Sequence, residues 1–273
     1  MTLVPASDGL PARVVHRWSD EKLFYLEQYM GIFTRGMKDL WEGRLVYADF
    51  FAGPGLCIEE GAGTESLGSP LRALDFDFMR IFLNDADPNA VEALRRRTQG
   101  DGRVRITQLD CNDAVGPALD FLVPPGEERR TLGLAFIDPT AHQMRFEAIR
   151  EFTTGVNFDL LITFMTNFPR RFISQPGFGP RSDFARFIGL DAYEQKVQGR
   201  FRIETYELLE IYRDQLSSIR YDYVDDITRI VNTRGSTIYH SVFASRHPRG
   251  KDFFEKISQR TYSGQQRMQF PGL

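Results

Sequence analysis

The feature that most constrains the fold is an alternation of short apolar runs with longer amphipathic stretches, from about residue 45 to residue 165. The runs have the length of buried strands, and the stretches carry apolar side chains at helical spacing. Strands that alternate with helices form a parallel sheet through right-handed crossovers, with helices on both faces. We therefore predict a doubly wound, mostly parallel α/β sheet. Its strands are predicted over residues 45–51, 80–84, 103–108, 132–137 and 159–165, and its helices over residues 88–98, 112–122 and 144–154.

The segments on either side of this alternation have patterns of their own. Residues 17–41 are predicted to form a helix, because apolar and aromatic side chains recur there at intervals of three and four. Glycines and prolines interrupt the alternation in residues 170–218, which we interpret as a helical insertion or lid. The end of the chain predicts an antiparallel hairpin over residues 222–231 and 237–245, with a turn at Asn232-Thr233-Arg234-Gly235, and then a helix over about residues 251–261. Since we find no internal repeat, we expect residues 1–273 to form a single domain.

Composition narrows the class of protein further. A hydrophobic content of 42% in 273 residues can build a sizeable core. No apolar run approaches the roughly 18 residues of a membrane span, so we expect a cytoplasmic protein without membrane contact. The two cysteines, Cys57 and Cys111, stand at no metal-ligand spacing, which argues against a zinc site and a disulfide framework. The net charge of −3 does not indicate a nucleic-acid surface over the whole protein.

The first predicted strand ends in an acidic residue and a glycine-rich turn. Asp49 closes the strand, and Gly53 and Gly55 follow it. Glycine allows the backbone to approach a bound nucleotide closely, because it has no side chain and tolerates unusual torsion angles. The spacing is not GxGxxG, so an adenosyl-amino-acid site fits better than a dinucleotide site.

The second and third strand ends also carry carboxylates. Asp85 follows the second strand and is placed to accept hydrogen bonds from ribose hydroxyls, with capping of the next helix by Asp85 or Asp87 as the alternative. Asp110 follows the third strand, where a carboxylate can bind an adenine amino group. The alternative there is that Asn112 or Asp113 caps the following helix.

The fourth and fifth strand ends supply candidate groups for a substrate. Asp138 and Thr140 follow the fourth strand around a proline, and His142 is the histidine placed beside the crevice, as a candidate proton acceptor. The set Asn167, Arg170 and Arg171 follows the fifth strand, as candidate substrate contacts. A further polar segment is Gly68-Ser69-Pro70-Leu71, in which we expect Ser69 to cap a helix, with binding of a carboxylate or phosphate at that helix N-terminus as the alternative.

Four strand-end segments resemble, in their order along the chain, the motifs of class I S-adenosylmethionine-dependent methyltransferases. They are Asp49-x-Phe51-Ala52-Gly53-x-Gly55, Asn84-Asp85, Asp110 and Asp138-Pro139. The resemblance implies a Rossmann-like fold with S-adenosylmethionine as cofactor. It also implies that Phe51 and the glycine turn contact the methionine portion, that Asp85 binds ribose, and that Asp110 and Cys111 lie by adenine. The fourth motif departs from the family pattern, since Thr140 and Ala141 stand where that family has a second proline and an aromatic residue.

The chain more specifically resembles the bacterial three-Cys-motif partner proteins, or TcmP, from about residue 16 to residue 257. The matching segments are Phe50-Phe51-Ala52-Gly53-Pro54-Gly55, Gly68-Ser69-Pro70-Leu71, Phe136-Ile137-Asp138-Pro139, Phe164-Met165-Thr166-Asn167-Phe168 and Tyr239 to Pro248. This resemblance implies association with a phage-derived type of protein that carries a three-cysteine, radical-SAM-like motif.

Three functions follow as hypotheses. The first is methyl transfer to a nucleic acid or protein, with Asp138 positioning the acceptor. The second is a non-catalytic scaffold for the three-cysteine partner, which the altered fourth motif favours. The third is a metal-dependent nuclease that uses Asp49, Asp85, Asp110 and Asp138 as an acidic cluster.

Overall fold

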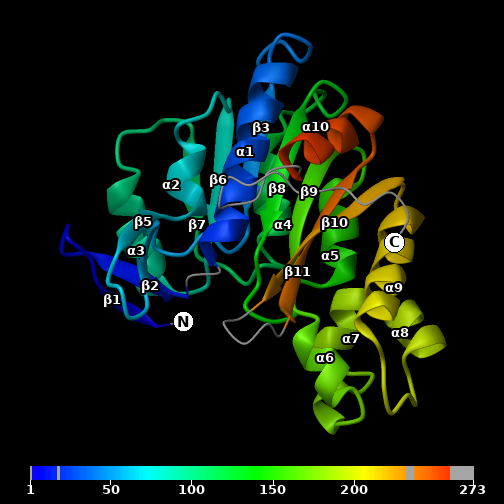
Figure 1. Ribbon diagram of the computed structural model, residues 1–273. Coiled ribbons are helices and arrows are strands. Elements are labelled where there is room, and N and C mark those ends of the chain that lie inside the picture. The colour runs from blue at the N-terminus through cyan, green and yellow to red at the C-terminus, as the bar shows by residue number, and fades with distance from the viewer. Residues whose placement is uncertain (1, 17–18, 232–236, 259–273) are drawn as a thin grey trace.

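The computed structural model describes residues 2–16, 19–231 and 237–258 (Figure 1). The predicted turn at Asn232–Gly235 and the last residues of the predicted C-terminal helix lie outside the described residues.

A seven-stranded sheet forms the centre of the molecule. Its strands are β3 (Leu45–Asp49), β6 (Arg80–Asn84), β7 (Val104–Thr107), β8 (Leu132–Ile137), β9 (Asn157–Phe164), β10 (Tyr223–Val231) and β11 (Thr237–Ser245). They are arranged in the order β10-β11-β9-β8-β3-β6-β7, and β11 runs in the direction opposite to the other six described strands. Strands β3 and β8 are buried along their whole length, as expected where helices cover both faces of a parallel sheet. The predicted mixed α/β sheet and its C-terminal antiparallel pair are confirmed.

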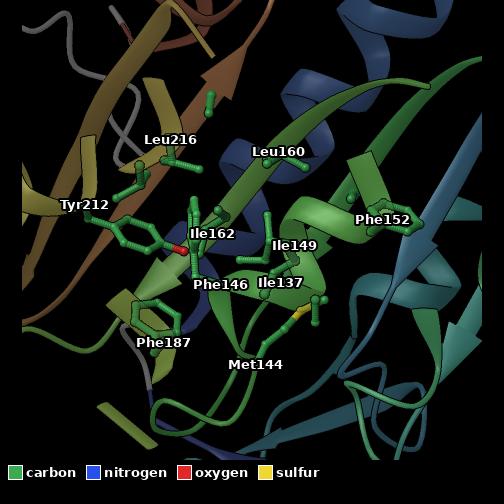
Figure 2. Packing of buried hydrophobic residues seen from close by; sticks show 14 of the residues in the cluster. Ile137, Met144, Phe146, Ile149, Phe152, Leu160, Ile162, Phe187, Tyr212 and Leu216 are labelled. Carbon is green, nitrogen blue, oxygen red and sulfur yellow. The ribbon is translucent and has the colours of Figure 1, made fainter. Parts of the chain in front are cut away.

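Helices cover the two faces of this sheet. They are α1 (Ser19–Met37), α2 (Ser69–Ala73), α3 (Pro88–Arg97), α4 (Val115–Leu122), α5 (Phe146–Thr153) and α10 (Pro248–Ser258). Aromatic side chains of α1 and α10 pack on one face, where Tyr29 contacts Phe243 of β11. On the other face, α4 and α5 bury a second cluster, in which Phe146, Ile149 and Phe152 lie against β8 and β9 (Figure 2).

The first helix is shorter than predicted. It ends at Met37, and Leu40, which continues the apolar spacing, is 61% exposed. The chain turns at Glu42 and Gly43, which have φ angles of 51° and 75°. A left-handed pair of this kind cannot continue a helix, so the last turn of the pattern is not helical.

The insertion is helical and is largely packed into the core. It contains α6 (Asn167–Phe172), a short 3₁₀ turn η1 (Pro176–Phe178), α7 (Asp183–Ile188), α8 (Leu190–Lys196) and α9 (Thr205–Ser218). Phe187 of α7 stacks on Tyr212 of α9 with ring centroids 4.9 Å apart, and both rings join the cluster around Phe146 (Figure 2). Helices α7 and α9 therefore extend the core, whereas α6 stays at the surface.

The structure also contains a second, four-stranded sheet that the sequence patterns did not predict. It consists of β1 (Leu3–Pro5), β2 (Pro11–Val15), β4 (Leu56–Glu59) and β5 (Glu65–Leu67), in the order β1-β2-β4-β5. Strand β2 pairs in parallel with β4, with Arg13 opposite Cys57. Because β4 directly follows the glycine turn after β3, this pairing brings the N-terminal strands to the carboxyl end of the central sheet.

Among the described residues, no helix combines the length and the apolar character that crossing a membrane requires.

Candidate functional site

The carboxyl ends of the parallel strands meet at a cavity of about 220 Å³. Open α/β sheets bind ligands at this place, outside the carboxyl ends of strands where the chain order reverses. Here the reversal lies between β3 and β8, since the chain runs from β3 outward to β7 and then returns. The lining residues are Arg13, Phe50, Phe51, Asn84, Asp85, Ala86, Asp87, Leu109, Asp110, Cys111, Asp138, Thr140 and Gln143.

The glycine turn lies next to this cavity and borders a smaller space that adjoins it. Gly53 and Gly55 have φ angles of 64° and 96°, which side chains rarely tolerate. A Cβ atom on Gly53 would meet no atom within 4 Å, whereas one on Gly55 would lie 3.1 Å from Leu71 and 3.3 Å from Leu94. A side chain at Gly53 would therefore point into open space, whereas Gly55 allows the turn to pack closely on α2 and α3.

Asp85 lies beside this turn and is held by backbone groups. Its Oδ2 accepts a hydrogen bond from the amide of Gly53 at 2.8 Å, and its Oδ1 accepts one from the amide of Asp87 at 2.9 Å. A carboxylate has about four acceptor positions, so Asp85 keeps lone pairs for two further donors. The capping role falls to Asp87, which accepts from Asn89 and Ala90 at the start of α3.

The loop after β7 forms the next wall. Asp110 is exposed and accepts from the amide and side chain of Asn112 at 2.9 and 2.8 Å. Cys111 is buried, and burial followed by the charge of Asp110 raises the pKa of its thiol to about 12. The capping alternative for this loop was wrong, because Ala114 precedes α4 and no side chain caps it. Asn112 instead joins the loop to the one after β8, through Gln143 and Arg145.

Asp49 is fully buried at the base of the glycine turn. Its Oδ1 accepts from the amide of Phe51 at 3.1 Å, and its Oδ2 accepts from the Tyr47 hydroxyl at 3.3 Å. Burial raises the pKa of Asp49 to about 7, although hydrogen bonds from Ser69 and Phe51 oppose the shift. The predicted cap by Ser69 was wrong: Gly68 occupies the cap position of α2, and the Ser69 hydroxyl interacts with Asp49. Asp49 therefore holds the start of the glycine turn in place through buried hydrogen bonds.

Asp138 is buried in an ion pair that the sequence did not predict. The ammonium of Lys22, on α1, donates to its two oxygens at 2.7 and 2.5 Å, and the Thr163 hydroxyl donates to Oδ1 at 2.6 Å. Burial alone would raise the pKa of Asp138, but the charges of Lys22 and Arg13 and these hydrogen bonds outweigh it and lower the pKa. Asp138 is thus a fixed negative charge at the crevice.

The other two candidates from this loop lie in different surroundings. Thr140 is exposed, lines the cavity and accepts from Gln143 at 2.8 Å. His142 is buried, its Nε2 lies 3.1 Å from the Met165 carbonyl, and three phenylalanine rings surround its imidazole, those of Phe164, Phe184 and Phe187. Burial lowers the pKa of His142 to about 4, and the residue is not among those that line the cavity.

The candidates after β9 lie on α6. Arg170 and Arg171 are exposed, whereas Asn167 is half-buried with its Oδ1 atom enclosed in protein. The structure therefore brings Phe51, Asp85, Asp110, Cys111, Asp138 and Thr140 together around one crevice and separates His142 from it. Gly53 is bound to Asp85, Gly55 borders the smaller adjoining space, and Asp49 is buried beneath the turn.

Sequence reasoning missed Arg13 and Lys22. Both come from the N-terminal segment, and Arg13 lies against the cavity and against a smaller adjoining space that Lys22 and Ser69 also border. No local motif marks them, because the pairing of β2 with β4 and the packing of α1 bring them to the crevice. The Asn84 side chain was also missed, although it joins the strand ends through Phe50, Thr107 and Leu109.

A larger cavity of about 390 Å³ lies at the opposite end of the sheet, between α1, α10 and the starts of β8 and β9. Asp159 is buried at this cavity and accepts from the Tyr29 hydroxyl at 2.7 Å.

Around the crevice, the strand-end carboxylates are not grouped as a metal site: among the described residues, no three His, Cys, Asp or Glu side chains could jointly hold an ion. The acidic cluster on which the nuclease hypothesis depends is not found among these residues.

Comparison of the sequence with protein-family models gives no match, and comparison with curated proteins gives none. Among solved structures, LPL1258 from Legionella pneumophila, a DUF519 protein, is similar with a TM-score of 0.53 and 10% identity, over 88% of this chain and 92% of that one. Trm1 from Pyrococcus horikoshii, in complex with S-adenosyl-L-methionine, matches with a TM-score of 0.48 and 14% identity, over 92% of this chain and 61% of that one. Magnesium protoporphyrin IX methyltransferase from Synechocystis, with bound SAM, gives a TM-score of 0.41 and 9% identity, over 85% of each chain. The likeness is one of fold, which is Rossmann-like.

Proposed function

We propose that this chain is a cytoplasmic S-adenosylmethionine-dependent methyltransferase that acts on a nucleic acid or protein. The observation that carries the proposal is the position of Asp85 beside the glycine turn, with its carboxylate bound to the Gly53 amide and two acceptor positions left for a ribose. The SAM-bound neighbours of similar fold support the choice of cofactor.

The residues of the crevice fit the parts of this cofactor. Asp85 accepts from ribose hydroxyls, Asp110 accepts from the adenine amino group, and Phe51 and Gly55 of the glycine turn lie beside the methionine portion. Arg13 is the cation beside the cavity that matches a carboxylate. When bound, the cofactor supplies an electrophilic methyl group. The protein contributes by orienting the acceptor, with Asp138 and Thr140 at the crevice.

Isothermal titration calorimetry with S-adenosylhomocysteine tests the cofactor site. We expect binding by the wild-type chain and at least tenfold weaker binding by Asp85→Asn, since hydrogen bonds to a charged group contribute about 1.5 to 3 kcal/mol. Asp120→Asn is the matched control, because Asp120 is exposed on α4 and does not line the cavity. A folded wild-type sample that binds no S-adenosylhomocysteine would rule out the cofactor assignment.

One observation favours a second candidate, a scaffold that binds the cofactor without transferring its methyl group. Lys22 occupies both oxygens of Asp138, so this carboxylate is engaged before any acceptor arrives. Incubation with methyl-labelled cofactor and cell extract separates the two candidates. Label in nucleic acid or protein supports transfer, and its absence from a sample that binds the cofactor supports the scaffold.

We also propose a partner, a three-cysteine protein with a radical-SAM-like motif. The resemblance of the chain to the TcmP proteins supports this partner. Co-expression of the two proteins followed by size-exclusion chromatography tests it. A shared peak supports the complex, whereas separate elution of two folded proteins contradicts it.

A further inference from the structure

The segment from residue 167 to residue 182, here called the α6 segment, is positively charged in an acidic protein. It contains Arg170, Arg171 and Arg181, and the sequence has no acidic residue from position 160 to position 182. All three arginines are exposed. Within the part of the chain that the structure describes, none of them forms an ion pair. Such an unneutralised group of cations attracts a polyanion.

Two exposed aromatic residues lie close to these arginines in the sequence. Phe168 and Phe172 are 44% and 36% exposed, and their spacing of four residues places them on the same side of α6. Phe164, Phe184 and Phe187, which come just before and just after this segment in the chain, are buried in the hydrophobic core, whereas Phe168 and Phe172 are not. Exposed rings beside arginines can stack with nucleic-acid bases, because every base has a π face.

The α6 segment is attached to the candidate crevice. Thr163, at the end of β9, donates to Asp138, and the Met165 carbonyl binds His142, two residues beyond Thr140. The Thr166 hydroxyl lies 2.9 Å from Nδ1 of His240, which fixes the start of α6 on β11. Helix α6 lies at the same end of the central sheet as the small N-terminal sheet, so the two flank the strand ends (Figure 1).

We propose that the α6 segment binds single-stranded nucleic acid and presents one nucleotide to the crevice as methyl acceptor. The acceptor role rests on the proposed function, whereas the binding itself does not. Single strands fit better than a duplex, because paired and stacked bases cannot lie against Phe168 and Phe172. An acidic peptide would match the arginines and leave the exposed rings unexplained.

Fluorescence anisotropy with labelled 20-nucleotide RNA and DNA of mixed sequence, single-stranded and duplex, tests the proposal on the full chain. The variants are Phe168→Ala/Phe172→Ala and Arg170→Glu/Arg171→Glu. Matched controls are Phe201→Ala, whose ring is 89% exposed, and Arg95→Glu/Arg96→Glu, an exposed arginine pair on α3. Thermal unfolding and S-adenosylhomocysteine calorimetry on every variant check the fold and the cofactor site.

We expect single strands to bind at least fivefold more tightly than duplexes, with RNA and DNA compared directly. The phenylalanine variant should lose about fivefold or more, and the arginine variant about tenfold or more with a flatter salt dependence. The controls should stay within twofold. The proposal would be overturned if the variants bound the oligonucleotides as tightly as the wild type, or if duplexes bound more tightly than single strands. It would also be overturned if methyl label entered only protein and Arg170→Glu/Arg171→Glu transferred as much label as the wild type. If the wild type binds no S-adenosylhomocysteine but the variants still bind the oligonucleotide more weakly than the wild type does, this inference holds and the proposed function does not.

Discussion

At the scale of single residues, the buried pair of Lys22 and Asp138 has the clearest energetic consequence. Both side chains are almost enclosed, and the Thr163 hydroxyl satisfies a further lone pair of the carboxylate. Removing one member of such a pair leaves an uncompensated charge in protein, which is strongly destabilising. The pair also joins α1 to the end of β8, and so it fixes one wall of the crevice.

We predict that Lys22→Met destabilises the protein by about 3 kcal/mol at pH 7. The wild-type pKa of Asp138 lies below its ordinary value of 3.8, so the pair stabilises above that pH and its contribution is lost as the pH falls further. Without Lys22, burial raises the pKa of this carboxyl group, and the deficit should shrink on going from pH 7 to pH 5. Urea unfolding at both pH values measures this change.

The double variant Lys22→Met/Asp138→Asn provides the control. It removes the buried charge together with its partner and should recover most of the lost stability. A double variant as unstable as Lys22→Met would show that the loss comes from packing of the lysine stem.

At the scale of elements, the sequence predicted the parts that follow a local period. The strands over residues 80–84 and 132–137 and the hairpin strand over residues 237–245 have the predicted bounds. The small sheet was not predictable in this way, because its short strands are mostly half-buried or exposed and lack the continuous apolar runs of the central strands. In addition, β2 pairs with β4, which follows α1 and β3 in the chain.

The residues of the candidate site also differ in whether a local pattern in the sequence predicts them. Its carboxylates follow strands of the central sheet, where topology alone predicts that they meet. Arg13 and Lys22 depend on long-range packing, so no spacing in the sequence indicated them. His142 was a candidate by its place in the chain, and the aromatic rings that bury it come from elsewhere, on β9 and α7.

The contact between β8 and β9 leads to an element-scale prediction. Gly133 lies opposite Phe158, and a Cβ atom on Gly133 would fall 2.0 Å from the phenylalanine ring. We expect Gly133→Ala to destabilise by about 3 kcal/mol, because the ring is buried and cannot move away freely. Gly116→Ala is the matched control: the residue lies in α4, where an added Cβ meets no atom within 4 Å, and stability should rise by about 0.5 kcal/mol. Thermal and urea unfolding compare the two, and equal effects would contradict the steric explanation.

At the scale of the whole molecule, the central sheet separates two polar regions. The crevice lies at the carboxyl ends of its parallel strands, and the larger cavity with Asp159 lies at their amino ends. Tyr29 of α1 and Ser245 of β11 both bind Asp159, so this group joins the helical layer to the sheet. Burial raises the pKa of Asp159 to about 6, although these two hydrogen bonds oppose the shift.

The sign of this shift predicts a pH dependence of stability. A carboxyl group with a raised folded-state pKa stabilises below its unfolded value of 3.8, and this contribution is lost as the pH rises through about 6. Between pH 4.5 and pH 7.5 the wild type should lose about 2 kcal/mol through Asp159. Asp159→Asn, which can still accept from Tyr29, should not show this loss. Urea unfolding across the pH range should therefore give a variant that gains on the wild type as the pH rises, and parallel curves would contradict the assignment.

The parallel pairing of β2 with β4 also sets an order of events during synthesis. Strand β2 leaves the ribosome before α1 and β3, and it can pair only with β1 until β4 has been made. Arg13 can reach the crevice only after this non-local contact forms, although the glycine turn itself is local. Arg13 pairs opposite Cys57, whereas Leu45 of β3 pairs opposite Leu132 of β8, about twice as far along the chain. The contact that brings Arg13 to the crevice can therefore form before the strands of the central sheet are complete.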